Sequence, residues 1–131
     1  MAWLDTLFQH MVETGASDLH VTSGQAPMLR LHGEMTRVEG AEAIAPERLL
    51  EVLYEITPES NRKEFEETHD TDYAYALEGW ARFRANLFRD RCGPGAVFRV
   101  IPSEILTTEQ LNLPPAVLEL CDLPKGLVLV T

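Results

Sequence analysis

Five arginines lie between residues 79 and 102, where only one acidic residue accompanies them. A guanidinium group is planar and carries several donors, so it can bind phosphate or carboxylate oxygens through two parallel hydrogen bonds. The preceding stretch, 42–78, holds eleven acidic and three basic residues. The cluster therefore indicates either an anion site or neutralisation of this acidic stretch. The five are Arg82, Arg84, Arg89, Arg91 and Arg99.

The residues around these arginines alternate between apolar and polar, as β-strands do. Strands are predicted over 80–88 and 96–101, with a hairpin turn at the Gly-Pro-Gly sequence of 93–95. If the register places Arg84 opposite Arg99, both side chains project from the same face of the sheet. Like charges directly opposite each other destabilise a sheet by up to about 1 kcal/mol, so such a pair is easier to explain if an anion lies between or above them. Both interpretations, an anion site and charge neutralisation, stay open at this point.

The other reactive residue types form no catalytic or metal-binding pattern. Cys92 and Cys121 are isolated and are expected to be reduced thiols, and no histidine has the spacing of a metal ligand. Asp18 and His20 share the exposed face of a predicted strand over 17–23. No serine or cysteine nucleophile accompanies them, which favours hydrogen bonding at a sheet edge over catalysis. We expect no catalytic residue and no metal ligand in this chain.

Hydrophobic periodicity predicts the elements that position these residues. An apolar stripe over 3–12 predicts an amphipathic helix that ends at Gly15, and two short apolar runs flanking 33–34 predict a β-hairpin. Further helices are predicted from Pro46 to Ile56 and from about Thr57 to Glu67, with acidic outer faces. A strand is predicted from Thr71, a short helix after Pro114 and a buried strand over 125–131.

Length and charge limit the classes of function. The chain has 131 residues, about one domain. Its net charge of −10 disfavours nucleic acid and anionic membranes as partners. No apolar run approaches the roughly 18 residues of a membrane span, and the N-terminus lacks the basic region of a signal peptide, so we expect a cytoplasmic protein without membrane insertion.

Several motifs together resemble those of a known family. They are Gly15–His20 (GASDLH), Ala81–Asn86 (ARFRAN), Gly95–Pro102 (GAVFRVIP), Leu111–Pro114 (LNLP) and Gly126–Thr131 (GLVLVT). In order and spacing they resemble the N-terminal domain of the type IV pilus retraction ATPases, the PilT twitching-motility proteins of the secretion ATPase superfamily. The resemblance covers essentially the whole chain.

The resemblance implies a fold and a site. The fold would be α+β, a PAS-like domain over 1–102 with an antiparallel sheet and flanking helices. Residues 103–131 would be the linker and first strand of a RecA-like ATPase domain. In such proteins ATP binds with Mg²⁺ between the two domains of a hexameric ring, and the resemblance implies that Arg84 and Arg99 reach its phosphates. Arg82 is a second-rank candidate.

The resemblance also bears on activity and partners. In the family, GxxxxGK[ST] follows a strand ending in Val-Thr, and this sequence contains no such motif. We therefore expect the chain alone to be inactive and to hold no cofactor. The implied partners are its own RecA-like domain, neighbouring subunits of a homohexamer and the inner-membrane pilus platform protein, at the cytoplasmic side of the pilus base. The alternatives are a protein-interaction module that docks through the acidic helices, or a PAS-type sensor with an internal ligand cavity.

Overall fold

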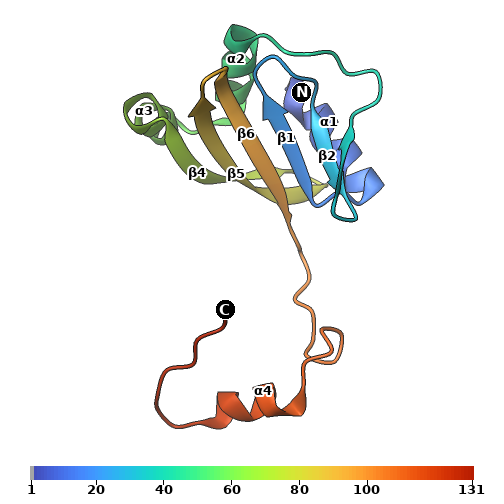
Figure 1. Cartoon of the computed structure of the whole chain (residues 1–131), viewed down its shortest axis with the longest axis vertical. Coiled ribbons are helices and arrows are strands. Elements are labelled where there is room, and N and C mark those ends of the chain that lie inside the picture. The colour runs from blue at the N-terminus through green and yellow to red at the C-terminus, as the bar shows by residue number, and fades with distance from the viewer. Residues whose placement is uncertain (1) are drawn as a thin grey trace.

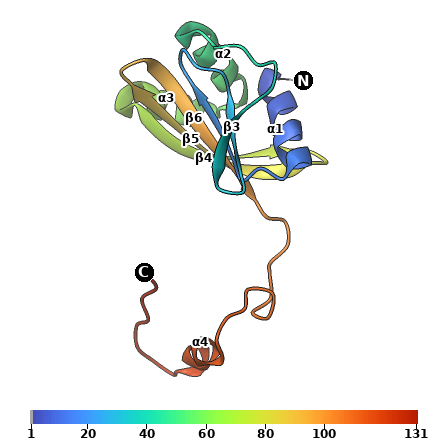
Figure 2. The same ribbon diagram turned by 45° about the vertical axis from the view of Figure 1, so that its right-hand side comes forward.

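A six-stranded antiparallel sheet with helices packed on one face forms the body of the molecule in the computed structural model, which describes residues 2–131 (Figures 1 and 2). The strand order is β3-β2-β1-β6-β5-β4. This confirms the expected α+β class with flanking helices. The elements are α1 (Trp3–Thr14), β1 (Asp18–Thr22), β2 (Met28–Leu31), β3 (Glu34–Arg37), α2 (Pro46–Ile56), α3 (Glu59–Thr68), β4 (Asp70–Leu77), β5 (Ala81–Asp90), β6 (Gly93–Ile101) and α4 (Pro115–Glu119), followed by a 3-10 turn over Leu120–Asp122.

The core lies between the sheet and helix α1. Phe8 of α1 is fully buried and packs against two strands, with its ring centroid 4.5 Å from that of Phe83 and 4.9 Å from that of Phe98. Gly15 ends α1 at a φ of 71°, a left-handed conformation that glycine adopts without strain. The chain therefore enters β1 immediately, as the sequence predicted.

Helices α2 and α3 complete the covered face and confirm the two helices predicted after Pro46. Helix α2 buries Leu49, Val52 and Leu53. Helix α3 buries Phe65 and lies beside β4, where the Asn61 amide donates hydrogen bonds to Thr71 Oγ1 (2.8 Å) and to the backbone oxygen of Asp72 (3.1 Å). The edge strand β4 is thereby tied to a helix at the point where it carries Asp72.

The turn between β5 and β6 was predicted two residues too late. The Gly-Pro-Gly segment belongs to β6, and the turn lies at 91–92, where Asp90 Oδ1 accepts hydrogen bonds from the backbone N–H groups of Cys92 and Gly93. Gly95 sits beneath the Phe88 ring, and a Cβ at this position would lie 2.6 Å from a ring carbon. Gly95 of β6 therefore lets the Phe88 ring of the neighbouring strand β5 approach its backbone closely, which explains a glycine inside a strand at this position.

Two other details differ from the sequence predictions. Strand β1 lies in the middle of the sheet, between β2 and β6, so the expectation that Asp18 and His20 lie at a sheet edge was wrong. The β2–β3 hairpin is confirmed, but its turn comprises His32 (φ 48°) and Gly33 (φ 86°) instead of Gly33 and Glu34. Two successive left-handed residues are typical of tight hairpin turns whose twist matches that of the strands.

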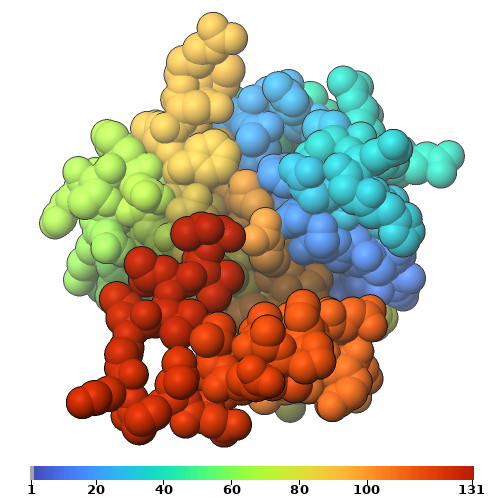
Figure 3. Space-filling view, turned by 60° about the horizontal axis from the view of Figure 1, so that its bottom comes forward, coloured from blue at the N-terminus to red at the C-terminus, as the bar shows by residue number. Residues whose placement is uncertain are grey.

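After β6 the chain leaves the sheet as an arm, residues 103–131 (Figures 1 and 3). The short helix predicted after Pro114 is present as α4, and almost every residue of the arm is exposed. Residues 126–131 are assigned to no helix or strand, so their expected place in the sheet of a second domain stays a prediction. None of the helices in the described part of the chain is long and apolar enough to cross a membrane.

Candidate anion-binding site

Four charged side chains form one row across four adjacent strands. Asp18 of β1 pairs with Arg30 of β2 on one side and with Arg99 of β6 on the other, and Arg99 in turn pairs with Arg84 of β5. The row lies on the face of the sheet opposite the helices, which we call the open face. It brings together residues that are up to 81 positions apart in the sequence.

The register of β5 and β6 puts both candidate arginines on the open face. Their neighbours Phe83 and Phe98 are fully buried on the helix side, and alternation sends Arg84 and Arg99 to the other side. The condition set from the sequence, Arg84 opposite Arg99, is therefore met, although the turn was misplaced. The two-residue turn after Asp90 supplies the odd register sum on which this juxtaposition depends.

Arg99 is held by a buried carboxylate. Its Nε donates to Oδ1 of Asp18 at 2.7 Å, while Ser17 Oγ donates to Oδ2 at 2.7 Å and Arg30 Nε lies 3.7 Å from Oδ2. The Asp18 side chain is only 3% exposed. Burial acts to raise the pKa of Asp18, but hydrogen bonds from Ser17 and Arg99 and nearby positive charge outweigh it, so the pKa lies below its ordinary value of 3.8.

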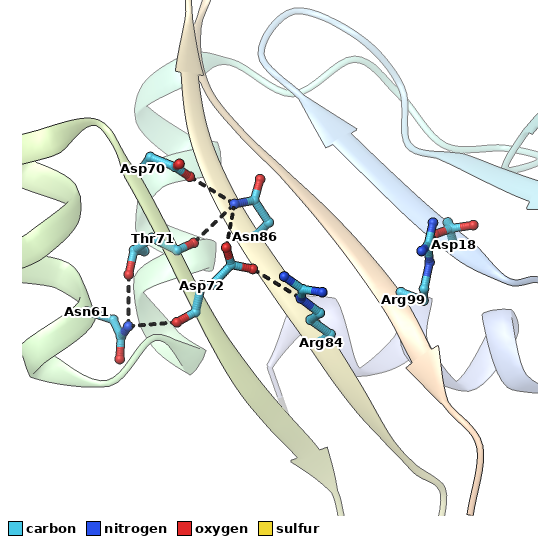
Figure 4. A network of polar contacts seen from close by, with 8 residues as sticks. All are labelled: Asp18, Asn61, Asp70, Thr71, Asp72, Arg84, Asn86 and Arg99. Atoms are coloured by element: carbon cyan, nitrogen blue, oxygen red, sulfur yellow. Dashed lines mark hydrogen bonds and ion pairs between the residues drawn. The ribbon is translucent and has the colours of Figure 1, made fainter. Parts of the chain in front are cut away.

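Arg84 is held more loosely, by a carboxylate in solvent. Its Nε lies 3.4 Å from Oδ1 of Asp72, whose side chain is 50% exposed. Asn86 donates to Oδ2 of Asp72 at 3.3 Å and to Oδ1 of Asp70 at 2.8 Å (Figure 4). Exposed ion pairs of this kind contribute little to stability, since solvent and salt screen them.

A pocket of about 290 Å³ opens between the two arginines. The guanidinium groups bond to the carboxylates through Nε, and their side chains are 71% and 70% exposed for Arg84 and Arg99. Their terminal amino groups therefore remain available to a ligand. The pocket is lined by Asp18, Asp72, Arg84, Asn86, Val97 and Arg99.

A second, more apolar hollow of about 400 Å³ adjoins the same pair. Arg84 and Arg99 line it together with apolar side chains on the stretch that ends β6 and begins the arm, among them Ile101 and Pro102. The two arginines thus lie between a polar and an apolar hollow of the open face.

The remaining arginines of the cluster are not part of this pocket. Arg82 lies on the open face opposite Ile101, and Arg91 is exposed in the β5–β6 turn. Arg89 places its guanidinium carbon 5.8 Å from the centre of the Phe65 ring of α3, a cation–π contact. Of the five arginines, Arg84 and Arg99 line the pocket, and the other three lie outside it.

The Asp18 and His20 pair does not resemble a catalytic dyad. The partners of Asp18 are arginines and a serine, which agrees with the expected hydrogen-bonding role. Burial is the largest influence on His20 and lowers its pKa; Asp18 opposes this shift, and Arg30 and Arg99 add to it. Sequence reasoning missed the carboxylates that hold the arginines, although strand alternation already placed Asp18 on a polar face.

The site fits phosphate groups better than a metal ion. Among residues 2–131, no group of three histidine, cysteine or acidic side chains is arranged to hold a metal. Two opposed guanidinium groups with exposed amino groups are a suitable donor set for phosphate oxygens. Because two carboxylates already balance their charge, a phosphate must share the guanidinium groups or displace a carboxylate.

Comparisons with known proteins identify the domain. No family model matches the chain. It is 40% identical over 125 residues to the type IV pilus retraction ATPase PilT of Pseudomonas aeruginosa, covering 95% of this chain and 36% of that protein. It is 36% identical over 121 residues to a twitching motility protein of Neisseria gonorrhoeae, covering 88% and 32%. The chain thus spans about a third of the length of these relatives.

Solved structures give the same result for the fold. The crystal structure of the pilus retraction motor PilT with bound ADP matches 93% of this chain and 35% of that chain, at 33% identity and a TM-score of 0.77. The ATPase DotB of Legionella pneumophila shares the fold, with a TM-score of 0.69 at 18% identity over 89% of this chain and 33% of its own. By sequence and fold together, the chain belongs with the N-terminal domains of the PilT-type ATPases.

Proposed function

We propose that this chain is the N-terminal regulatory domain of a hexameric type IV pilus retraction ATPase, and that Arg84 and Arg99 contribute to binding the ATP phosphates between domains. The observation that carries the proposal is the opposed pair of exposed arginines on the open face. The names of the relatives at 40% and 36% identity support the assignment to pilus retraction and twitching motility.

The chemistry assigned to the pair is electrostatic. In a full-length ATPase of this family, ATP bound with Mg²⁺ would supply the phosphoryl group that is transferred to water. Guanidinium groups placed at its terminal phosphate stabilise the negative charge that develops during transfer. Because the sequence contains no GxxxxGK[ST] motif, this chain alone would bind nucleotide weakly and hydrolyse none.

Membership of a pilus retraction ATPase would also determine how the chain is divided into domains and how it assembles. Residues 1–102 would form the PAS-like domain, and residues 103–131 the linker and first strand of the RecA-like domain. Exposed apolar side chains along the arm, among them Ile105, Leu127 and Val130, support a role in packing against another domain. The assembly would be a cytoplasmic homohexamer bound to the inner-membrane pilus platform protein.

The core argues against the ligand-sensor alternative. A sensor requires a cavity between the sheet and helices, where the rings of Phe8, Phe83 and Phe98 pack together. The interaction-module alternative retains one favourable observation, the exposed acidic residues on the outer faces of α2 and α3, including Glu47, Glu51 and Glu67. It requires a basic partner, which the phosphate proposal does not.

Titration with tripolyphosphate tests the phosphate role in this chain. Chemical shifts of the arginine Nε–H groups should change in a saturable manner, and Arg84→Ala or Arg99→Ala should weaken binding about three- to tenfold. Arg91→Ala is the matched control, because it removes the same charge from the same hairpin but outside the pocket. Equal losses in all three variants, or no saturable shift in the unchanged chain, would contradict the proposal.

A further inference from the structure

The two arginines of the pocket are held in different ways. Arg99 donates at 2.7 Å to a carboxylate that is 3% exposed, whereas Arg84 donates at 3.4 Å to one that is 50% exposed. Both bonds use Nε, so the contrast lies in the carboxylates and not in the arginine atoms.

Asp18 is itself fixed from three directions. Its backbone pairs with β2 and β6 in the middle of the sheet, Ser17 donates to Oδ2 at 2.7 Å, and Arg30 lies 3.7 Å from the same oxygen. Since its pKa lies below the ordinary 3.8, the carboxylate stays ionised at neutral pH. Asp72, in contrast, belongs to the edge strand β4 and shares its carboxylate with Asn86.

We propose that Asp18 is a positioning residue, which fixes Nε of Arg99 and so holds its terminal amino groups in the pocket before a phosphate arrives. Asp72 holds Arg84 in an exchangeable pair that the phosphate replaces. This inference rests on the proposed phosphate-binding function. A long side chain ordered in advance loses less entropy on binding than one that is free.

Asp18→Asn and Asp72→Asn should change anion binding in opposite directions. Removing a negative charge beside two arginines should strengthen anion binding by simple Coulomb attraction. Asp72→Asn should follow this rule and strengthen tripolyphosphate binding. Asp18→Asn should weaken it about three- to tenfold, because the cost of ordering one long side chain then falls on the binding step.

The positioning itself can be measured without any ligand. In the unchanged chain, NMR should show slow exchange with water for the Arg99 Nε–H and fast exchange for that of Arg84. Asp18→Asn should bring Arg99 to the fast rate of Arg84. Ser17→Ala, which keeps the charge and removes one bond to the carboxylate, should give an intermediate rate and keeps the test available if Asp18→Asn does not fold.

These measurements separate the positioning role of Asp18 from the proposed phosphate-binding function. Equal exchange rates for the two arginines in the unchanged chain, or tripolyphosphate binding to a folded Asp18→Asn chain as tight as to the unchanged one, would overturn the inference alone. A chain with slow Arg99 exchange that binds no tripolyphosphate would instead overturn the proposed function and, with it, this role of Asp18. Slow Arg99 exchange together with opposite effects of Asp18→Asn and Asp72→Asn would support both.

Discussion

Arg84 and Arg99 lie directly opposite each other on β5 and β6, yet their guanidinium groups bond to carboxylates on opposite sides of the pair. Arg84 pairs with Asp72 of β4, and Arg99 pairs with Asp18 of β1 (Figure 4). Local carboxylates thus supply the opposite charge that the sequence argument assigned to a bound anion. The sheet can hold the two arginines ready without a ligand.

Asp18 should make the stability of the chain depend on pH in the acid range. Because its pKa is lowered by folding, its contribution is present above 3.8 and is lost as the pH falls through the lowered pKa. Asp18→Asn should cost about 1–3 kcal/mol of unfolding free energy at neutral pH and less in acid. Urea unfolding of both chains across this range measures the difference, and a difference that does not depend on pH would contradict the assignment.

Tyr73 and Tyr75 should ionise at an unusually high pH. Burial, the main cause for both, raises each pKa to about 12, and at Tyr75 the hydrogen bond to Asp5 (2.9 Å) adds to the shift. The contribution of these groups to stability should persist below pH 10 and decline as the pH rises from 10 toward 12. Tyrosinate absorbance, compared with that of Tyr75→Phe, should show this titration; two tyrosines that ionise near pH 10 in the folded chain would contradict it.

Gly95 and Phe88 should be energetically coupled. A methyl group at Gly95 would lie 2.6 Å from a carbon of the Phe88 ring, so Gly95→Ala should force the ring away and cost about 1–3 kcal/mol. In a Phe88→Ala background the same change should cost little, because the ring is gone. Unfolding free energies of the two single variants and the double variant give the coupling directly, and additive effects would contradict the contact.

Much of the fold could be predicted because its patterns are local. The stripe that buries Phe8, the left-handed Gly15 and the alternation around Arg84 each follow from the residues themselves. The turn after Asp90 could not, since the Gly-Pro-Gly signal is stronger than the Asp90 side-chain bonds that make the real turn. The glycine at position 95 is explained by its close contact with the Phe88 ring on the neighbouring strand, which the local sequence does not show.

The candidate site could be predicted only in part. Strand alternation puts Arg84 and Arg99 on one face only if the hairpin has an odd register sum, and it is the structure that supplies this register. The carboxylates that hold them come from strands distant in sequence, and nothing local reports that Asp18 is buried or that β1 occupies the centre of the sheet. Strand order is a property of the whole chain, and it is the strand order that gives Asp18 its two arginine neighbours.

ATP hydrolysis by a hybrid, in which this chain replaces the matching N-terminal part of Pseudomonas aeruginosa PilT, tests the central claim most directly. With Arg84→Ala or Arg99→Ala the rate should fall at least about tenfold, whereas Arg91→Ala should leave it unchanged. This chain alone should hydrolyse no ATP. If both pocket variants hydrolyse ATP at the rate of the unchanged hybrid, the arginine pair serves charge balance within the sheet and the proposed role in phosphate binding is wrong.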